Sequence, residues 1–213
     1  MKKSFACVAM LFFALSLSAG DGNWIFRGRV ITVSPNEDSS QIGATGSEVA
    51  VDDAIVPELD LTYMFSPNWG LEVIAATSPH DLSAKGGALA GADAGEVWVL
   101  PPTFTLQYHF GYKTDVDFYL GVGLNVSLFH SYDVSNDLLG LGVNDIDFDT
   151  SVGPAGNMGV DFKISDKWVF NIDAKYIAIS TDADLQLTAG GTLATVEVDI
   201  NPWVAGIGVG FHF

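Results

Sequence analysis

Apolar and polar residues alternate along several stretches of this chain. In residues 118–129, Leu120, Val122 and Leu124 fall on one face of an extended chain, and mainly glycine, asparagine and serine fall on the other. A period of two indicates a β-strand whose two faces meet different surroundings. The same alternation predicts eight strands, at residues 24–33, 55–65, 69–76, 103–110, 118–129, 152–164, 168–178 and 203–213.

The connections between these strands alternate in length. Short turns are expected at residues 66–68, 111–117 and 165–167, and long connections near residues 35–54, 79–98, 131–150 and 181–196. Short turns at one rim and long loops at the other are typical of outer-membrane barrels, whereas a secreted β-sandwich has no reason to sort its loops. The sequence therefore predicts an all-β fold: an eight-stranded antiparallel transmembrane β-barrel with short periplasmic turns and long extracellular loops.

The first twenty residues have the pattern of a cleaved secretory signal. Two lysines precede an apolar run, and small residues follow it, so cleavage is expected after Ala19 or Gly20. The run is shorter than the roughly 20 apolar residues that a membrane-spanning helix needs. Residues 1–20 are therefore predicted to be a signal peptide, and residues 21–213 a single outer-membrane barrel.

Composition narrows the range of functions. The net charge of −17 argues against nucleic-acid binding, because few cations are present to neutralise phosphates. The hydrophobic content of 48% and the mean hydropathy of +0.30 are too high for a disordered acidic chain. The only cysteine, Cys7, lies in the signal segment, so no disulfide is expected in the remaining chain.

No cofactor and no metal site is expected. The run Asp145, Asp147 and Asp149 has carboxylates at a calcium-like spacing, but it lacks the glycine and the distal glutamate of a calcium loop. The acidic loops are interpreted as solvated surface, and binding of cations that bridge lipopolysaccharide is kept open.

Charged residues are predicted on the inward faces near the periplasmic turns. Unpaired charges in such a space would each cost several kcal/mol, so a paired network is expected to fill the lower barrel. A catalytic carboxylate pair is not favoured, because charges of both signs neutralise one another. The predicted network comprises Arg27, Arg29, Asp60, Glu72, Asp161, Lys163 and Asp173.

Further along the same strands the inward positions become apolar. A water-filled channel would not select such residues. They form a packed plug, or strand tops that rise above the membrane, or a pocket that is open above and closed below by the charged network. The predicted lumen-lining residues are Ile31, Val33, Val56, Ile74, Ala76, Phe129, Ile177 and Ile179.

Prolines gather near the loop rim. Pro79 is expected to end the third strand, and Pro101 and Pro102 to open the fourth. Proline gives a strand ladder no N–H and is normally excluded from paired interiors. These prolines either mark strand ends or weaken the wall enough to form a lateral opening through which an apolar ligand passes into the bilayer.

Several stretches resemble the OmpW family of small outer-membrane barrels. They are "LTYMFSPNWGLEVIAATSPH" (61–80), "LPPTFTLQYHF" (100–110), "YLGVGLNVSLF" (119–129), "AGNMGVDFKISDKWVFNIDAKYI" (155–177) and "INPWVAGIGVGFHF" (200–213). The resemblance implies a barrel with a narrow hydrophobic lumen in the Gram-negative outer membrane, and passive uptake of small hydrophobic molecules with lateral release. It also implies that Ile74 narrows the lumen. Lys175 stands where a large aromatic residue is expected, so it is counted among the lumen-lining residues as one that admits a more polar ligand.

Two other function classes are considered. An enzyme would need a nucleophile, a base and an acid at the outer rim, and the neighbours of His80 and His130 point to opposite faces of their strands, so an enzyme is not expected. The alternative to transport is a structural or surface-interaction protein, such as a stress-response protein or a phage or bacteriocin receptor. The expected partners are outer-membrane lipid and lipopolysaccharide, the outer-membrane assembly machinery and a small hydrophobic substrate.

The last strand alternates up to Phe213. Phe211 and Phe213 share its apolar face, and they resemble the aromatic signal that the assembly machinery reads. Gly206, Gly208 and Gly210 share the opposite face, where they are expected to leave room for inward side chains of neighbouring strands.

Overall fold

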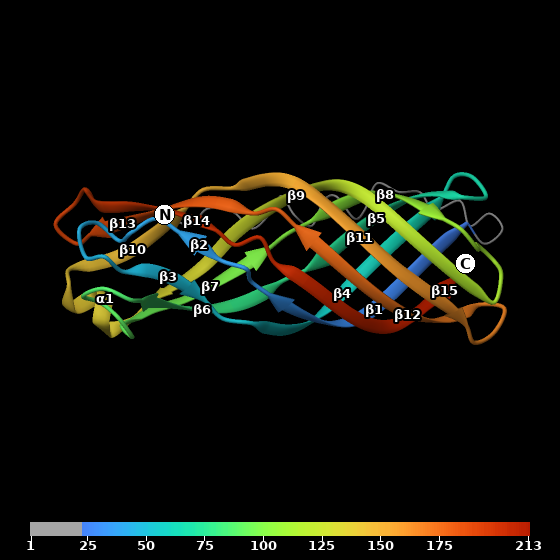
Figure 1. Cartoon of the computed structure of the whole chain (residues 1–213), viewed down its shortest axis with the longest axis horizontal. Coiled ribbons are helices and arrows are strands. Elements are labelled where there is room, and N and C mark those ends of the chain that lie inside the picture. Colours follow the sequence, from blue (N-terminus) through green and yellow to red (C-terminus); the bar gives the residue numbers. More distant parts are fainter. Residues whose placement is uncertain (1–22) are drawn as a thin grey trace.

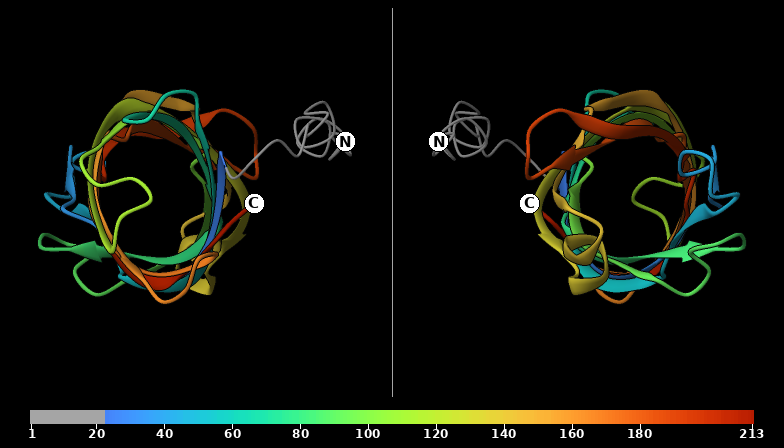
Figure 2. Two further views of the ribbon diagram at one scale, coloured as in Figure 1. Left: turned by 90° about the vertical axis from the view of Figure 1, so that its right-hand side faces the viewer. Right: turned by 90° about the vertical axis from the view of Figure 1, so that its left-hand side faces the viewer.

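Eight antiparallel strands close into a barrel in the computed structural model, which describes residues 23–213. The ring is visible when the molecule is viewed along its long axis (Figure 2). Each barrel strand pairs with the next in the order given, and the last pairs with the first. The barrel strands are β9 (Val116–Val134), β8 (Thr103–His109), β5 (Trp69–Ala76), β4 (Ala54–Met64), β1 (Trp24–Ser34), β15 (Trp203–His212), β12 (Trp168–Ile177) and β11 (Ser151–Lys163). The predicted signal peptide lies outside the described residues.

The predicted alternation decides which face of each strand points outward. Ile55 is 73% exposed and Val122 is 71% exposed, and both lie on the outer surface of the barrel. On the inward faces of the same two strands, Val56 and Tyr119 are buried. An outer surface made of Val, Leu, Ile and aromatic side chains over the length of the barrel suits a lipid bilayer and not water.

Short turns join the barrel strands at one end of the molecule. Aromatic rings cluster beside these turns, with centroids 4.6 Å apart for Trp24 and Tyr63 and 5.0 Å apart for Trp69 and Tyr108. Such rings form the interfacial girdle of outer-membrane barrels. The turn between β8 and β9 bends across the barrel opening at this end (Figure 2).

At the other end the predicted long connections are present, and most of their residues form strands and not irregular loops. They extend the wall well beyond the barrel and form the left half of the molecule in Figure 1. One extension joins β7, β6 and β3 to the upper part of β9, and a separate four-stranded sheet has the order β10-β13-β14-β2. The added elements are β2 (Asp38–Ser39), β3 (Glu48–Val51), β6 (Ser78–Lys85), β7 (Asp93–Leu100), helix α1 (Asn136–Gly140), β10 (Val143–Phe148), β13 (Ser180–Leu187) and β14 (Thr192–Asp199).

Helix α1 is a short element of five residues, capped at its start by the Ser135 side chain. Within residues 23–213, the structure contains no helix of the length and apolarity required to span a membrane.

The wall pairing is interrupted where the barrel meets the extension. The β5–β8 ladder ends at Ile74 opposite Thr103, and the β6–β7 ladder resumes in the same register at Ser78 opposite Val99. Pro101 and Pro102 lie in the gap, as the missing N–H groups require. Pro79 does not end a strand as predicted: it lies within β6 opposite Trp98.

A second interruption lies at the start of β4. Residues 54–57 pair with β1, but the β4–β5 ladder begins only at Glu58 opposite Ala76. Among the described residues, no strand ladder joins residues 54–57 to β6. The wall is therefore weakest around the junction of β5 with β6.

Candidate functional site

Glycines on β15 make room for the side chains that fill the lower barrel. A Cβ atom at Gly208 would lie 2.1 Å from the carbonyl oxygen of Gly28 and 2.9 Å from Cγ of Arg29. A Cβ atom at Gly210 would lie 3.0 Å from Cγ of Arg27. The side-chain-free face of β15, predicted from the sequence, is what lets the two arginines of β1 cross the lumen.

Arg27 is fully buried and binds carboxylates from two opposite walls. Its Nη1 lies 3.1 Å from Asp60 on β4, and its Nη2 lies 2.6 Å from Asp161 on β11. Nη1 also donates a hydrogen bond to Thr62. The guanidinium thereby links β4 to β11 through the barrel interior.

Arg29 makes the corresponding contacts one step higher on β1. Its Nη1 lies 2.8 Å from Glu58, and its Nη2 lies 2.5 Å from Asp60 and 3.5 Å from Glu72. Its Nε donates a 2.6 Å hydrogen bond to Asn171. Each side of this guanidinium therefore faces an acceptor.

Lys175 belongs to the same network, which corrects its predicted place in the apolar lumen. Its Nζ lies 2.8 Å from Glu58 and 2.5 Å from Asp173. Asp173 in turn accepts a 2.7 Å hydrogen bond from the Tyr119 hydroxyl. The alternation correctly indicated that Lys175 points inward. It could not indicate that the long side chain reaches down to the carboxylates of the network, because a period of two carries no information on height.

Lys163 lies outside this network, contrary to the prediction. It is 35% exposed at the short-turn rim and pairs with Asp166 at 3.0 Å. Glu58 was missed, although it precedes Asp60 on the same inward face of β4. We use the name charged plug for the buried group Arg27, Arg29, Glu58, Asp60, Glu72, Asp161, Asp173 and Lys175.

The charged plug separates two cavities. A lower cavity of about 420 Å³ opens at the short-turn end and is lined by residues such as Lys113, Asp161 and His212. An upper cavity of about 540 Å³ has Glu58 and Ile74 among its lining residues. Within residues 23–213 the two cavities share no lining residue, and the buried ion pairs lie between them.

The upper cavity, called the apolar chamber below, is lined mainly by aliphatic side chains. Seven of the predicted lumen residues line it: Ile31, Val33, Ile74, Ala76, Phe129, Ile177 and Ile179. Val56 belongs to the surrounding apolar cluster but does not line the chamber.

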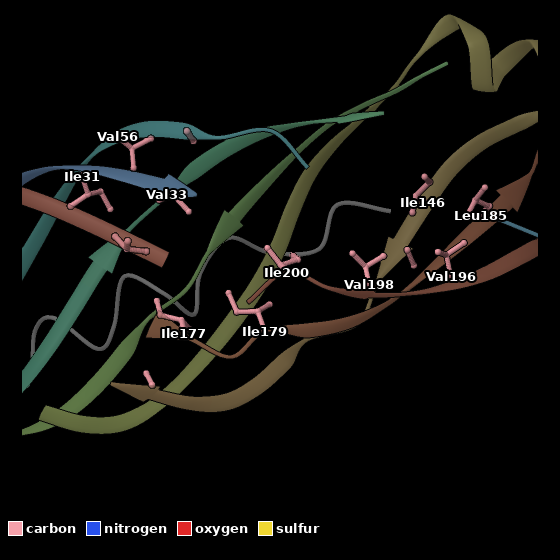
Figure 3. Packing of buried hydrophobic residues seen from close by; sticks show 14 of the residues in the cluster. Ile31, Val33, Val56, Ile146, Ile177, Ile179, Leu185, Val196, Val198 and Ile200 are labelled. Atoms are coloured by element: carbon pink, nitrogen blue, oxygen red, sulfur yellow. The ribbon is translucent and has the colours of Figure 1, made fainter. Parts of the chain in front are cut away.

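The extension contributes most of the lining residues, and the barrel strands contribute the part next to the charged plug. Figure 3 shows Ile146, Leu185 and Val196 continuing the row of apolar side chains that begins with Ile31 on β1. The sequence prediction missed these residues because it treated their segments as loops. The signal was present in the alternation of residues 182–185, where Asp182 and Asp184 are outward and Ala183 and Leu185 are buried.

Few polar side chains reach the apolar chamber. One pair is Ser78 and His80 on β6: His80 Nδ1 lies 2.8 Å from the carbonyl oxygen of Asp52, and Nε2 lies 2.9 Å from Ser78 Oγ. The carbonyl can only accept, so Nδ1 carries the proton and Nε2 accepts from Ser78. Burial in the extension, beyond the lipid-facing belt, lowers the pKa of His80 below its usual value. The polar lining residues are Thr45, Glu58, Ser78, His80, Asp93 and Thr181.

The His80 contact bridges the weak part of the wall. Asp52 precedes β4, and His80 lies on β6, across the segment where the two strands share no ladder. The His80 side chain there adds to the main-chain hydrogen bond that the Asp52 N–H donates to the Asp81 carbonyl oxygen at 3.1 Å.

The rim histidines form no catalytic triad. The described hydrogen bonds of His80 go to Ser78 and to the main chain of Asp52, not to the carboxylate of Asp81. His130 lies 3.5 Å from Thr77 Oγ1 and 3.2 Å from Ser131 Oγ. Within residues 23–213, no hydrogen bond joins either ring to a carboxylate that would orient it, as a catalytic triad requires.

The acidic residues of the extension lie mainly on outer faces. Asp147 is directly opposite Asp184, and Asp182 is directly opposite Glu197. Among residues 23–213, no group of three or more His, Asp or Glu side chains is placed so that it could hold a metal ion.

Phe211 and Phe213 lie at the short-turn end of β15. Phe211 packs edge-on against Trp168, with ring centroids 5.0 Å apart, and the Phe213 main chain exchanges hydrogen bonds of 3.1 and 3.2 Å with Trp24. Their role as an assembly signal stays a prediction.

The fold and the site together define a small outer-membrane barrel with a charged floor and an apolar chamber. Residues 20–213 match the model of the OmpW family, and the chain belongs to that family. This match covers every residue that the structure describes.

Relatives and solved structures agree with this assignment. The chain is 37% identical to outer membrane protein W of Vibrio cholerae over 98% of this chain and 96% of that protein. The crystal structure of OprG from Pseudomonas aeruginosa matches with a TM-score of 0.82 at 33% identity, over 90% of this chain and 96% of that one. The structure of AlkL in lipid bilayers shares the fold, with a TM-score of 0.66 at 20% identity, over 91% of this chain and 90% of that one. The protein is thus an outer-membrane barrel.

Proposed function

We propose that this protein mediates passive uptake of small hydrophobic molecules across the outer membrane. The observation that carries the proposal is the apolar chamber of about 540 Å³, whose lining is almost entirely aliphatic. A cavity of this size and character suits a small apolar ligand. The family resemblance points to the same activity, and no enzymatic activity is proposed.

The charged plug determines which way a ligand can leave. A hydrophobic molecule would have to displace buried ion pairs to continue toward the periplasm, which is costly. The gap in the wall ladder at Pro101 and Pro102 offers another route, and Pro101 itself lines the apolar chamber. Lateral release through this part of the wall into the bilayer is therefore part of the proposal.

The chamber is tested first by binding. A small apolar fluorescent probe is added to the purified barrel in lipid nanodiscs, with native protein, Ile74→Asp and Ile74→Leu compared. Ile74 is 4% exposed and lines the chamber, so an ionised carboxylate there should weaken probe binding at least tenfold. Ile74→Leu conserves side-chain volume and should bind like the native protein.

Heat modification on gels shows whether each variant is folded. Equal probe affinity in folded Ile74→Asp and native protein would mean that the probe binds elsewhere, and the chamber would lose its assigned role.

Transport is tested in cells. A deletion strain should take up a long-chain or aromatic hydrocarbon more slowly than its parent, and native protein should restore the rate. Ile74→Asp, produced at the same level, should not restore it. Equal uptake by deletion strain and parent would favour the alternative function.

The alternative is a structural or surface-interaction protein that contacts lipopolysaccharide. The acidic extension favours it: Lys85 is the only Lys or Arg in residues 35–57, 77–102, 130–150 and 178–202. Directly opposed carboxylates repel one another, so Asp182 opposite Glu197 suits bound counterions. This role predicts altered surface properties of the deletion strain with unchanged hydrocarbon uptake. The outer-membrane assembly machinery is a proposed partner under either function.

A further inference from the structure

Glu58 presents a hydrogen-bond acceptor at the floor of the apolar chamber. Its Oε1 lies 2.8 Å from Arg29 Nη1 and 2.8 Å from Lys175 Nζ. No hydrogen bond from the described residues reaches its other oxygen, Oε2, and Glu58 is one of the residues that line the chamber. Glu58 Oε1 thus accepts hydrogen bonds from two side chains, while Oε2 can accept one from a group inside the chamber.

The surrounding charge favours a positive or neutral partner over a negative one. The charged plug contains three cations, Arg27, Arg29 and Lys175, and the five carboxyl groups Glu58, Asp60, Glu72, Asp161 and Asp173. Among residues 23–213, no Lys or Arg lines the chamber, and the other carboxylate in the lining is Asp93. An anionic head group entering the chamber would meet excess negative charge at low dielectric, and no free donor would receive it.

We propose that the apolar chamber selects single-chain amphipathic molecules whose polar end donates hydrogen bonds, with that end on Glu58 Oε2. The head group is a primary ammonium or a primary alcohol, and the alkyl chain lies along the aliphatic lining toward Ile179 and Ile200. Fatty-acid anions of the same chain length are excluded. This inference rests on the proposed uptake function and names its substrate class.

The test compares head groups at constant chain length. Octylamine, 1-octanol and octanoate are titrated into nanodiscs that contain native protein with labelled isoleucine methyl groups. Empty nanodiscs give the correction for partition into lipid. Charge-assisted hydrogen bonds are about twice as strong as neutral ones, so octylamine should bind best, 1-octanol next, and octanoate at least tenfold more weakly than octylamine.

Ligand orientation gives a second measurement that needs no variant. Nuclear Overhauser contacts from the ligand carbon next to the head group should reach the methyl groups of Ile31 and Ile74, near the floor. Contacts from the terminal methyl should reach Ile179 and Ile200, which lie further along the row of side chains in Figure 3. The reversed orientation would contradict the assignment of Glu58.

Two matched variants separate the Glu58 contact from the overall charge. Glu58→Gln removes one negative charge and keeps the shape, so the preference for octylamine over octanoate should fall several-fold. Asp173→Asn removes one negative charge from the same network, but Asp173 does not line the chamber, so the native ranking should persist. Equal loss of preference in both variants would show that Glu58 does not contact the head group.

The outcomes distinguish this inference from the proposed function. If all three ligands shift the chamber methyl groups with equal affinity, the head-group selection is wrong and uptake of hydrophobic molecules still stands. If no ligand shifts them in the native protein, the uptake proposal itself fails.

Discussion

The two halves of the barrel interior are built from the same strands but have opposite chemistry. On β1, Arg27 and Arg29 are followed two residues later by Ile31, and on β12 Lys175 is followed by Ile177. The change occurs at matching heights on neighbouring strands, since Arg29 is opposite Glu58 and Ile31 is opposite Val56. The difference teaches that the same strands can block the barrel with ion pairs and also line an apolar chamber. This is possible because the inward residues change from charged to apolar at one level along the barrel axis.

The largest expected effect comes from removing one partner of the charged plug. Arg29→Met leaves Glu58 and Asp60 with fewer partners inside the barrel. Breaking a buried pair in this way typically costs about 3–5 kcal/mol. Urea unfolding of the barrel in lipid measures the loss of unfolding free energy.

The matched change in the upper half is Val33→Ala, which removes two methyl groups from a residue that lines the apolar chamber. It should lower the free energy of unfolding less than Arg29→Met does, because the chamber wall is already incompletely packed. Equal losses of unfolding free energy in the two variants would show that the two halves of the interior do not differ in their contribution to stability.

A smaller effect is expected from filling the glycine face of β15. Gly208→Val places a Cβ atom 2.1 Å from the Gly28 carbonyl oxygen, and the wall must shift to admit it. Overpacking of this kind costs about 1–3 kcal/mol or more. The yield of heat-modifiable, inserted barrel should fall.

Gly28 provides the control for this prediction, because a Cβ atom there meets nothing within 4 Å. Gly28→Ala should insert normally. Normal insertion of Gly208→Val would mean that the arginines of the plug do not depend on the glycine face.

The wall gap gives a kinetic prediction. Pro101→Thr restores an N–H on the side of the chain that faces β5, because the main chain of the adjacent Pro102 faces β9, where its carbonyl oxygen accepts from Val126. The wall between β5 and β8 should therefore pair more continuously. Probe affinity should remain at the native value, while hydrocarbon uptake by cells should slow several-fold. Unchanged uptake would show that release does not use this part of the wall.

The smallest effect concerns the His80 hydrogen bond across the wall. Burial lowers the pKa of His80, so its contribution to stability is full above the usual histidine pKa of about 6.5 and is lost as the pH falls through the lowered value. Hydrogen exchange of β6 amides, corrected for intrinsic rates, should accelerate at acidic pH relative to β1 amides.

The variant His80→Gln should remove most of this pH dependence. Equal acceleration in native protein and His80→Gln would show that the acid sensitivity does not come from His80.

The sequence predicted the barrel well because alternation reports directly which face of a strand is inward. The limits of seven barrel strands follow from it to within one residue, as do the outward face of Val122 and the inward face of Ile74. The eighth strand, β9, runs to Val134, beyond its predicted end at residue 129. Alternation does not report height along the barrel axis or the reach of a long side chain. Lys175 was therefore placed in the apolar half, and Lys163 in the network although it lies at the rim.

The extension was missed for a different reason. Its strands alternate small or aliphatic residues with aspartate and threonine, as in residues 180–187, and their acidity resembles that of a solvated loop. Pairing between segments distant in the sequence, such as β14 with β2, turns these stretches into a wall. Most of the chamber lining comes from the extension, so the sequence alone could not give the size of the cavity.

The central claim is that the apolar chamber above Glu58 holds a hydrophobic molecule. The most direct measurement is a crystal structure of the protein soaked with 1-iodooctane, with iodine located by its anomalous scattering. We predict an iodine peak inside the chamber, between Ile31, Ile74 and Ile179. Iodine peaks confined to the lipid-facing surface of the barrel would contradict the claim.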